Sequence, residues 1–455
     1  MRKKRWILWT IVCLLGLWAL AGCKKESGQE QPGVQQEEQK DTGKKENKNK
    51  KTHKFVPEDY APGTGGMMVT DNGFYYYSCG TDLGYHYCDR TTKRPMYLCN
   101  KPECRHDGNE FCVATNARYY YLDECIYSEK LFLYALEVTE TQYLFKLLAA
   151  ELDGSAMNEV ATITTLEKTE GNISIDNCGM IIHRNTAMLE VHMEDSDMED
   201  VRYYGVAVLN LNTGEVSWLD EDPLGGDNVE VSRFRGYGDW IYYCRKEGKK
   251  KLLHRYHITE KTDEVCKLLT GFAGYYEVKD ADTVLYLRSG MSELCSYRYS
   301  TGENVEETRI MTVNRYYYTL DGISGVTEDY VEATDILDFQ TDGEYFYFPE
   351  LVRWLGSTDE EGNQYSRLDK AYVHVFNKEL EEIAVVDLAL EFPIPGFEET
   401  EWTKRPFTID LHYCGEEIFW TLSPQENMAE EYIFCCKRSD FLAGTPEFTF
   451  VYRQE

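Results

Sequence analysis

Beyond Phe55, the apolar residues of the chain form short runs and no helical stripe. No segment of helical length places apolar side chains at positions i, i+3, i+4 and i+7. Tyr, Phe, Val and Ile instead gather in runs that follow turn residues such as Gly, Asn and Asp, a pattern typical of strands joined by hairpins. The pattern therefore predicts an all-β domain.

Seven runs share a similar context, in which a turn ending in Gly or Asp precedes a strand of aromatic and β-branched residues. They occupy residues 71–77, 131–134, 178–183, 237–243, 281–286, 341–348 and 414–420. A second strand with a chain-reversing turn follows several of them, at residues 206–214, 253–261, 295–302 and 373–378. Successive runs lie roughly 45 to 70 residues apart, which is enough for one four-stranded unit with its loops and indicates a propeller or another array.

We accordingly predict a β-propeller over residues 55–455, with about seven four-stranded blades and with six or eight as alternatives. One such sheet alone leaves its edges and an apolar face open to water, whereas a ring of stacked sheets covers both. The 35 tyrosines of the chain fit this packing.

These runs resemble the repeats of envelope lipoproteins of Gram-positive anaerobes that carry a divergent β-propeller. In that family the repeats have the form Asp-Gly-x-aromatic-Tyr-Tyr, followed by a Tyr-containing strand and Thr-Gly. The resemblance extends from Val56 to the C-terminus and implies the fold. No Trp-Asp repeat, kelch double glycine or Ser-x-Asp-x-Gly box accompanies it, so it implies no particular ligand.

The first 22 residues have the layout of a secretory signal peptide. A cationic start, Met1-Arg-Lys-Lys-Arg5, precedes the uncharged residues 6–22, which are too few for a comfortable membrane span. The stretch ends in Leu20-Ala-Gly-Cys23, which resembles the lipobox of bacterial lipoproteins. The resemblance implies cleavage before Cys23, a diacylglyceryl group on its sulfur and an acylated, palmitate-type N-terminus on the outer face of the cell membrane. An uncleaved anchor with a chance cysteine is the alternative.

Charge separates the next segment from the domain. Residues 1–54 hold 13 Lys or Arg against 6 Asp or Glu, a net charge of +7, and residues 55–455 hold 35 against 73, a net charge of −38. Residues 23–54 are polar and contain one large aliphatic residue, Val34, so we expect a disordered basic tether behind the lipid. The acidic domain repels phosphate backbones, which argues against a nucleic-acid partner.

Cysteines form the one local cluster with a defined chemistry. Of the 15 in the chain, Cys13 leaves with the signal and Cys23 is lipidated, which leaves 13 in the mature domain. We treat residues 79–112 as a Cys-rich insertion, whose tightest part holds Cys99, Cys104, His106 and Cys112. Three thiols and one imidazole within 14 residues form a four-ligand tetrahedral zinc set of structural type.

Three hypotheses compete for this cluster. The first is zinc or another thiophilic metal, although the spacing matches no specific zinc finger. The second is two disulfides, in which Cys99, Cys104 and Cys112 are joined by Cys79, Cys88 or Cys125, since disulfides persist in exported proteins. The third is a set of free thiols in an organism that lives without oxygen. Leu-Cys-x-Lys-Pro-x-Cys-x-His segments also occur early in the lipoproteins that this chain resembles, which implies a feature of the family.

Motifs for catalysis are absent from the sequence: it has no phosphate-binding loop, no Gly-x-Ser-x-Gly elbow and no His-Glu-x-x-His. We therefore expect a monomeric, non-catalytic propeller that binds or scaffolds an envelope protein, a peptide or a glycan at its face. One alternative is a carbohydrate-active envelope enzyme whose site is assembled across blades. A second alternative is a metal- or redox-responsive protein centred on residues 99–112.

Overall fold

The structure is a computed structural model. It describes residues 59–62, 67–78, 83–92, 94–168, 173–175, 178–195, 202–220, 229–247, 250–266, 269, 271–288, 293–309, 317–318, 330–336, 339–358, 364–388, 407–414, 416–424 and 431–454. The chain separates into two units, Met1–Thr52 and His53–Glu455, and every described residue belongs to the second. The signal peptide, Cys23 and the tether to residue 54 thus lie outside the described residues.

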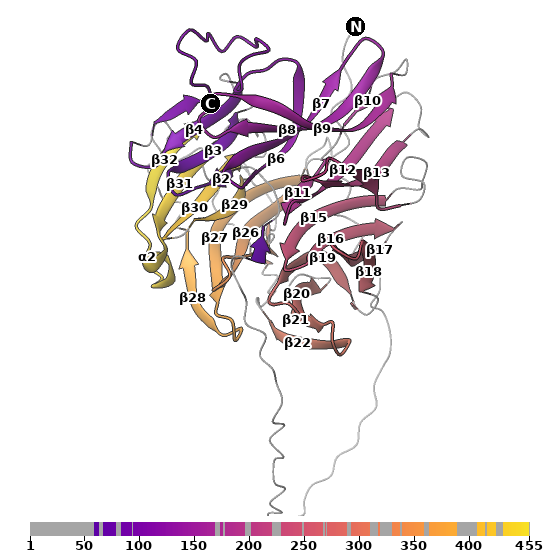
Figure 1. Cartoon of the computed structure of the whole chain (residues 1–455). Coiled ribbons are helices and arrows are strands. Elements are labelled where there is room, and N and C mark those ends of the chain that lie inside the picture. Colours follow the sequence, from indigo (N-terminus) through magenta and orange to yellow (C-terminus); the bar gives the residue numbers. More distant parts are fainter. Residues whose placement is uncertain are drawn as a thin grey trace, which may run out of the picture. The chain divides into compact units, whose positions relative to one another are not determined.

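The described part of the second unit consists almost wholly of strands, which confirms the all-β prediction. All described strand pairs are antiparallel, and strands that follow one another in the chain pair side by side (Figure 1). They form seven sheets of four to six strands. The single described helix is α2 (Arg438–Leu442).

The first three sheets follow each other along the chain. The first contains β2 (Met67–Val69), β3 (Gly73–Ser78), β4 (Gly84–Asp89) and β5 (Pro95–Tyr97). The second contains β6 (Tyr119–Tyr127), β7 (Lys130–Val138), β8 (Gln142–Glu151) and β9 (Met157–Glu167). The third contains β10 (Ile173–Ser174), β11 (Met180–His183), β12 (Thr186–Asp195), β13 (Arg202–Asn210) and β14 (Val216–Trp218).

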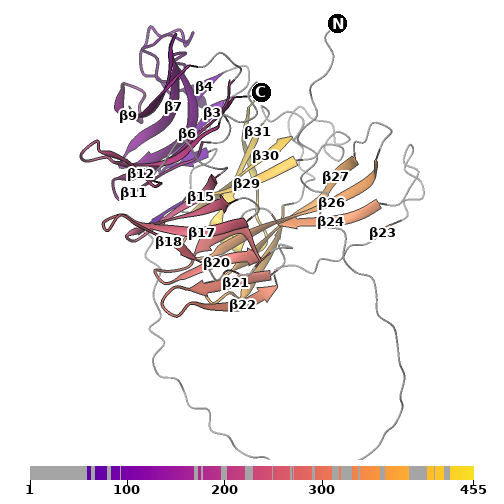
Figure 2. The same ribbon diagram turned by 90° about the vertical axis from the view of Figure 1, so that its right-hand side faces the viewer.

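Four further sheets complete the described part (Figure 2). The fourth adds the early strand β1 (Tyr60–Ala61) to β15 (Val229–Tyr237), β16 (Trp240–Glu247), β17 (Lys250–His257) and β18 (Thr262–Cys266). The fifth contains β19 (Phe272–Val278), β20 (Thr283–Arg288), β21 (Glu293–Arg298) and β22 (Glu303–Arg309). The sixth contains β23 (Tyr317–Tyr318), β24 (Tyr330–Ile336), β25 (Gln340–Thr341), β26 (Phe346–Thr358), β27 (Gln364–Phe376) and β28 (Glu382–Asp387). The seventh contains β29 (Phe407–Cys414), β30 (Glu417–Pro424), β31 (Glu431–Lys437) and β32 (Thr449–Gln454).

Each of the seven aromatic runs supplies residues to a strand of a different sheet. The strands concerned are β3, β7, β11, β16, β20, β26 and β30. The Thr-Gly signals are also reverse turns: Gly214 and Gly302 have φ values of 72° and 67°, and each backbone N–H bonds to the carbonyl four residues earlier. Glycine adopts this left-handed conformation without the steric cost of a Cβ atom, which is why it ends these strands.

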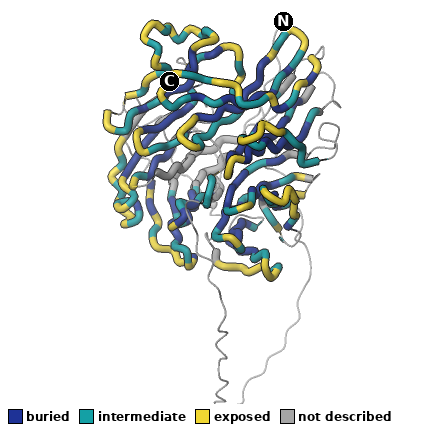
Figure 3. Tube along the Cα trace, in the orientation of Figure 1, coloured by how far each residue is buried: buried dark blue, intermediate teal, exposed yellow. Residues whose placement is uncertain are grey.

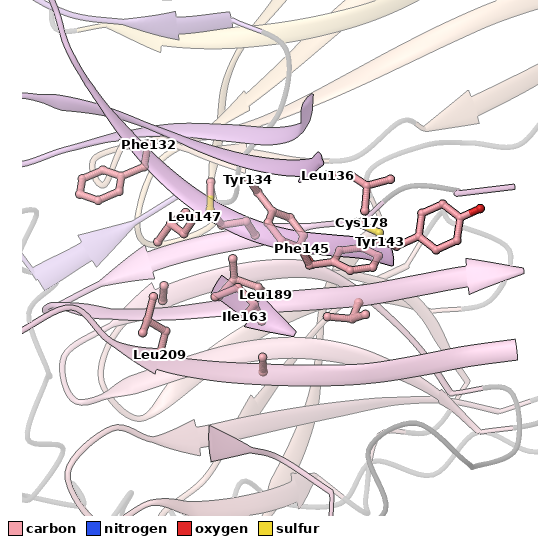
Figure 4. Packing of buried hydrophobic residues seen from close by; sticks show 14 of the residues in the cluster. Phe132, Tyr134, Leu136, Tyr143, Phe145, Leu147, Ile163, Cys178, Leu189 and Leu209 are labelled. Carbon is pink, nitrogen blue, oxygen red and sulfur yellow. The ribbon is translucent and has the colours of Figure 1, made fainter. Parts of the chain in front are cut away.

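Neighbouring sheets pack through apolar clusters. Between the second and third sheets, Tyr134 and Phe145 meet Leu189 and Leu209, all fully buried (Figure 4). Comparable clusters join the first sheet to the second, the third to the fourth, the fourth to the fifth and the fifth to the sixth. Buried residues run along the strands, and exposed ones concentrate in the connecting turns (Figure 3).

Two further contacts join the sixth sheet to the seventh and the seventh to the first, which closes the ring of sheets. Arg438, the first residue of α2, forms an ion pair of 3.0 Å with Asp342 in the β25–β26 turn of the sixth sheet. Phe74 of the first sheet packs on Phe419 of the seventh, with ring centroids 5.7 Å apart. Edge strands of neighbouring sheets also contact one another, since β6 lies next to β11, β11 next to β15, β15 next to β19, and β2 next to β29. This arrangement confirms a β-propeller.

Candidate metal centre

The predicted ligands lie in the connection between the first and second sheets, residues 98–118. Tight turns compact this segment: the N–H of Cys104 bonds to the carbonyl of Lys101 at 3.0 Å, and that of Cys112 to the carbonyl of Asn109 at 3.0 Å. His106, two positions after Cys104, adopts a left-handed φ of 53°. The chain therefore folds back three times within a few residues and returns its thiols to one place.

The structure brings Cys99, Cys104, His106 and Cys112 together. Their four donor atoms all lie within 4.8 Å of one another, and Nδ1 of His106 lies 3.5 Å from Sγ of Cys112. Around a tetrahedral zinc ion, with Zn–S of about 2.3 Å and Zn–N of about 2.0 Å, neighbouring ligand atoms lie about 3.3 to 3.8 Å apart. The donor set is that of a closed four-ligand site, and its atoms lie close enough together to hold a metal ion.

Local hydrogen bonds differ between the thiols. The backbone N–H of His106 bonds to the Cys104 sulfur and lowers its pKa, assisted by the Asn109 side-chain amide at 3.6 Å. Burial raises the pKa of Cys99 to about 11. N–H donors aimed at sulfur favour the thiolate, which is the form that binds metal.

Packing holds the segment on both sheets. The Tyr97 ring, at the end of β5, stacks on the His106 imidazole at 4.4 Å between centroids. On the other side, the turn after β8 lies close against the backbone of the segment. A Cβ atom, which Gly154 lacks, would come within 2.6 Å of the Cys99 nitrogen. The imidazole therefore packs on an aromatic ring, and the backbone at Cys99 packs on a glycine turn of the neighbouring sheet.

The range 79–112, which we treated as a Cys-rich insertion, includes β4 and β5 of the first sheet, while the cluster belongs to the connection that follows. Cys88 is buried in β4 beside Phe419 of the seventh sheet, and Cys125 packs in the cluster between the second and third sheets. Cys79 lies outside the described residues. Among the described residues, Cys99, Cys104, Cys112 and Cys125 are free cysteines.

A pocket of about 240 Å³ adjoins the cluster. It is lined by Glu110, Phe111, Asn116, Arg118, Tyr119, Leu148, Met157, Asn158 and Glu159. Glu110 and Phe111 directly precede Cys112, so the metal-site segment forms one wall, and β8 and β9 form another. Phe111 is 70% exposed. The sequence analysis missed this pocket because its far wall lies some 40 residues along the chain, although the aromatic residue beside a ligand cysteine was visible.

Several buried charged groups are engaged in structural pairs. Arg235 donates from Nε to Glu277 at 2.8 Å, and Lys146 contacts Glu137 at 2.8 Å and Glu159 at 2.7 Å. These contacts link strands within or between sheets. The carboxylates of Glu277, Glu137 and Glu159 therefore take part in ion pairs that stabilise the fold.

A helix that is both long and apolar enough to cross a membrane is not found among the described residues. Lipidation of Cys23 falls outside this part of the chain.

The chain was compared with known proteins. No family model and no curated protein matches it. Among solved structures, an oligogalacturonate lyase in complex with manganese is 11% identical, with a TM-score of 0.37, over 66% of this chain and 78% of the other. A prolyl endopeptidase is 11% identical with a TM-score of 0.49, and prolyl oligopeptidase B from Galerina marginata is 10% identical with a TM-score of 0.45. The matches cover 86% and 87% of this chain, which spans about half the length of those peptidases.

Proposed function

We propose that the protein is a lipid-anchored, extracytoplasmic β-propeller that binds an envelope partner without catalysis, and that a structural zinc ion on Cys99, Cys104, His106 and Cys112 fixes part of its binding surface. The observation that carries the proposal is the shared use of one segment. The connection of residues 98–118 supplies both the proposed metal ligands and one wall of the adjoining pocket, where Phe111 is largely exposed. Exposed aromatic side chains on a rigid support are common anchors of interfaces.

A closed metal site supports binding rather than chemistry. Four protein ligands leave a zinc ion no open position for water or substrate, so its contribution is to hold the segment in shape. In the adjoining pocket, Arg118 donates from Nε to Glu137 at 2.7 Å, and Glu159 pairs with Lys146. These groups are held by one another, which fits a recognition surface.

The anchor supports an envelope location. The signal peptide, the Cys23 lipobox and the basic tether belong together in a lipoprotein, and several acyl chains suffice for stable anchoring. Replacing Cys23 with Ser in the full chain is expected to move the protein from the membrane to the soluble fraction. Retention of the Cys23→Ser protein in membranes would argue for an uncleaved anchor.

Each of the seven sheets is taken as one blade in this proposal. Seven packed interfaces between successive sheets, including the one between the seventh and the first, support it. An electron-microscopy map of the protein viewed along the ring axis counts the blades directly, and a six-bladed map would contradict this part of the proposal.

Site-specific photo-cross-linking tests the binding function. A photoreactive amino acid at Phe111 is expected to capture a defined envelope partner in cells, whereas one at Ile383, an exposed apolar residue of β28 in the sixth sheet, is not. Capture at Phe111 is expected to fall when Cys104 is replaced by Ser. Equal capture at both positions would contradict the assignment of the surface. New reducing ends from a panel of envelope and plant polysaccharides would instead support the carbohydrate-active enzyme.

A further inference from the structure

The start of the described chain occupies an unusual place in the propeller. Strand β1 consists of Tyr60 and Ala61, which pair with Tyr237 and Gly236 on the edge of β15. This edge faces the neighbouring sheets, because β15 lies next to both β11 and β19. β1 belongs to none of the units built from consecutive strands, and it also contacts β11. A segment from one end of the domain is thus seated on the inner edge of the fourth sheet.

Two hairpin turns converge on Asp59, just before β1. Arg184 lies in the two-residue turn between β11 and β12, where it and the next residue have positive φ values typical of a type I′ turn. Its guanidinium forms ion pairs with the Asp59 carboxylate and with Asp239 of the β15–β16 turn. The N–H of Gly238, in the same β15–β16 turn, bonds to the Asp59 carbonyl at 2.9 Å.

The third and fourth sheets are fixed against each other at this point. Nε2 of His183 lies 2.7 Å from the Gly238 carbonyl, and burial lowers the pKa of this imidazole, which favours the neutral form with the proton on Nε2. A side chain at Gly236 would place its Cβ atom within 2.5 Å of the His183 ring, so only glycine fits opposite Ala61. The turns that receive Asp59 are therefore preformed.

Tyr60 reaches a charged pair between the fourth and fifth sheets. Its hydroxyl donates to Oε1 of Glu277 at 3.0 Å, while Nε of Arg235 donates to Oε2 at 2.8 Å. The side chains of Arg235 and Glu277 are only 9% and 0% exposed. A fully buried carboxylate that accepts from a phenol hydroxyl discriminates tyrosine from phenylalanine, because phenylalanine leaves that acceptor position unfilled.

We infer that this seat, formed by Arg184, Gly236, Gly238 and Glu277, is a peptide-binding site of the propeller. It takes an extended segment of the form Asp-Tyr-small residue by strand addition, and the chain's own Asp59-Tyr60-Ala61 fills it in the resting protein. A partner peptide of this type displaces residues 59–61 from the edge of β15. The main-chain pairing supplies the extended geometry, and the Asp and Tyr contacts supply the selectivity. The site is separate from the metal centre.

The test uses the full chain. The probe is a fluorescein-labelled peptide with the sequence of residues 56–63, and its binding is followed by fluorescence anisotropy. The Asp59→Ala/Tyr60→Ala double variant is expected to bind it at least about tenfold more tightly than the wild type, because the wild-type seat is occupied by a segment tethered at high effective concentration. Within the probe, replacing Tyr by Phe or Asp by Asn is expected to weaken binding to the double variant about tenfold.

Two controls make the outcome decisive. Arg184→Gln, introduced into the double variant at this partly exposed turn, is expected to weaken probe binding, whereas Arg298→Gln, a comparably exposed arginine of the fifth sheet, is not. A folded double variant that binds the probe no better than a scrambled peptide overturns the inference. So does equal binding of the Phe-containing probe.

If the double variant does not fold, a protease site placed between Pro62 and Met67 of the otherwise wild-type chain replaces it. After cleavage, the N-terminal fragment is expected to remain bound and to be displaced by excess probe. Immediate loss of the fragment, or retention unaffected by the probe, overturns the inference. None of these measurements depends on zinc or on capture at Phe111, so the inference and the proposed function can fail separately.

Discussion

Nε of Arg90 lies 2.6 Å from Oε2 of Glu417, 327 positions later in the chain, and joins the first sheet to the seventh. Their side chains are 24% and 29% exposed, so water competes for this pair. Phe74 and Phe419, both fully buried, pack at the same junction. Among the described strands, each of these two sheets is built from consecutive strands and exchanges none with the other. The junction therefore depends on side chains.

Phe74→Ala is expected to lower the free energy of unfolding by about 3 to 5 kcal/mol, since it opens a cavity in the closing cluster. Arg90→Gln is expected to cost less than about 1 kcal/mol, because the ion pair is partly hydrated. Urea unfolding of both variants measures the difference. An Arg90 effect as large as the Phe74 effect would show that charge, rather than apolar packing, closes the ring.

These long-range partners mark the limit of what the sequence predicts. Local patterns suffice for the aromatic runs and for the Gly214 and Gly302 turns, because a hairpin is a local structure. The gathering of Cys99, Cys104, His106 and Cys112 was also predictable, since they lie within 14 residues. Two-residue strands such as β1 carry no pattern of their own, and they form only because a distant edge is present.

The cysteine-rich range shows a second limit. Very short strands such as β5, which contains a proline, resemble loops in sequence, so an insertion appeared to begin at residue 79. β5 pairs with β4 through residues whose partners are visible only in the fold. The far wall of the pocket beside Phe111, formed by Met157 and its neighbours, depends on the same tertiary packing.

Lys146 provides a test of buried charge pairing. Its side chain is 7% exposed and contacts Glu137 and Glu159, and although burial lowers its pKa, these two carboxylates raise it overall. Lys146→Met removes the cation and leaves the largely buried Glu137 with less compensation, so a loss of about 3 kcal/mol is expected in urea unfolding. Lys130→Met is the matched control, because Lys130 and Glu151 are each more than 40% exposed and their pair contributes less than about 1 kcal/mol. Equal losses in the two variants would refute the buried-pair explanation.

His374 makes part of the stability depend on pH. Its ring nitrogens lie 2.5 Å from a Glu350 oxygen and 2.6 Å from a Glu382 oxygen, so both donate only when the ring is protonated. Burial lowers the pKa of His374, but the two carboxylates outweigh it and raise the pKa above the ordinary 6.5. The stabilisation is therefore complete below pH 6.5 and is lost as the pH rises through the higher pKa of the folded state.

His374→Gln is accordingly expected to lower the Tm more at pH 6 than at pH 9, as measured by thermal unfolding in matched buffers. Glu379→Gln, which removes an exposed charge from the turn after β27, serves as the control. Its Tm difference from the wild type is expected to be the same at pH 6 and at pH 9. A difference between wild type and His374→Gln that is constant from pH 6 to pH 9 would exclude the histidine as the titrating group.

Metal content distinguishes the three hypotheses for Cys99, Cys104 and Cys112. Protein purified without oxygen is expected to carry one zinc ion per chain by elemental analysis, and Cys104→Ser is expected to carry almost none, because the remaining three ligands no longer close the tetrahedron. Cys125→Ala is the matched control, since Cys125 packs between the second and third sheets, and it is expected to retain the metal.

A strong chelator should lower the Tm of the wild type by at least about 3 °C and leave that of Cys104→Ser unchanged, because the metal stabilises only the folded segment. Metal-free protein with fewer reactive thiols after denaturation would support disulfides instead. Metal-free protein with every thiol reactive would support free cysteines. In either case packing alone must hold Phe111 in the wall of the pocket. Photo-cross-linking of a partner at Phe111 should then not depend on Cys104.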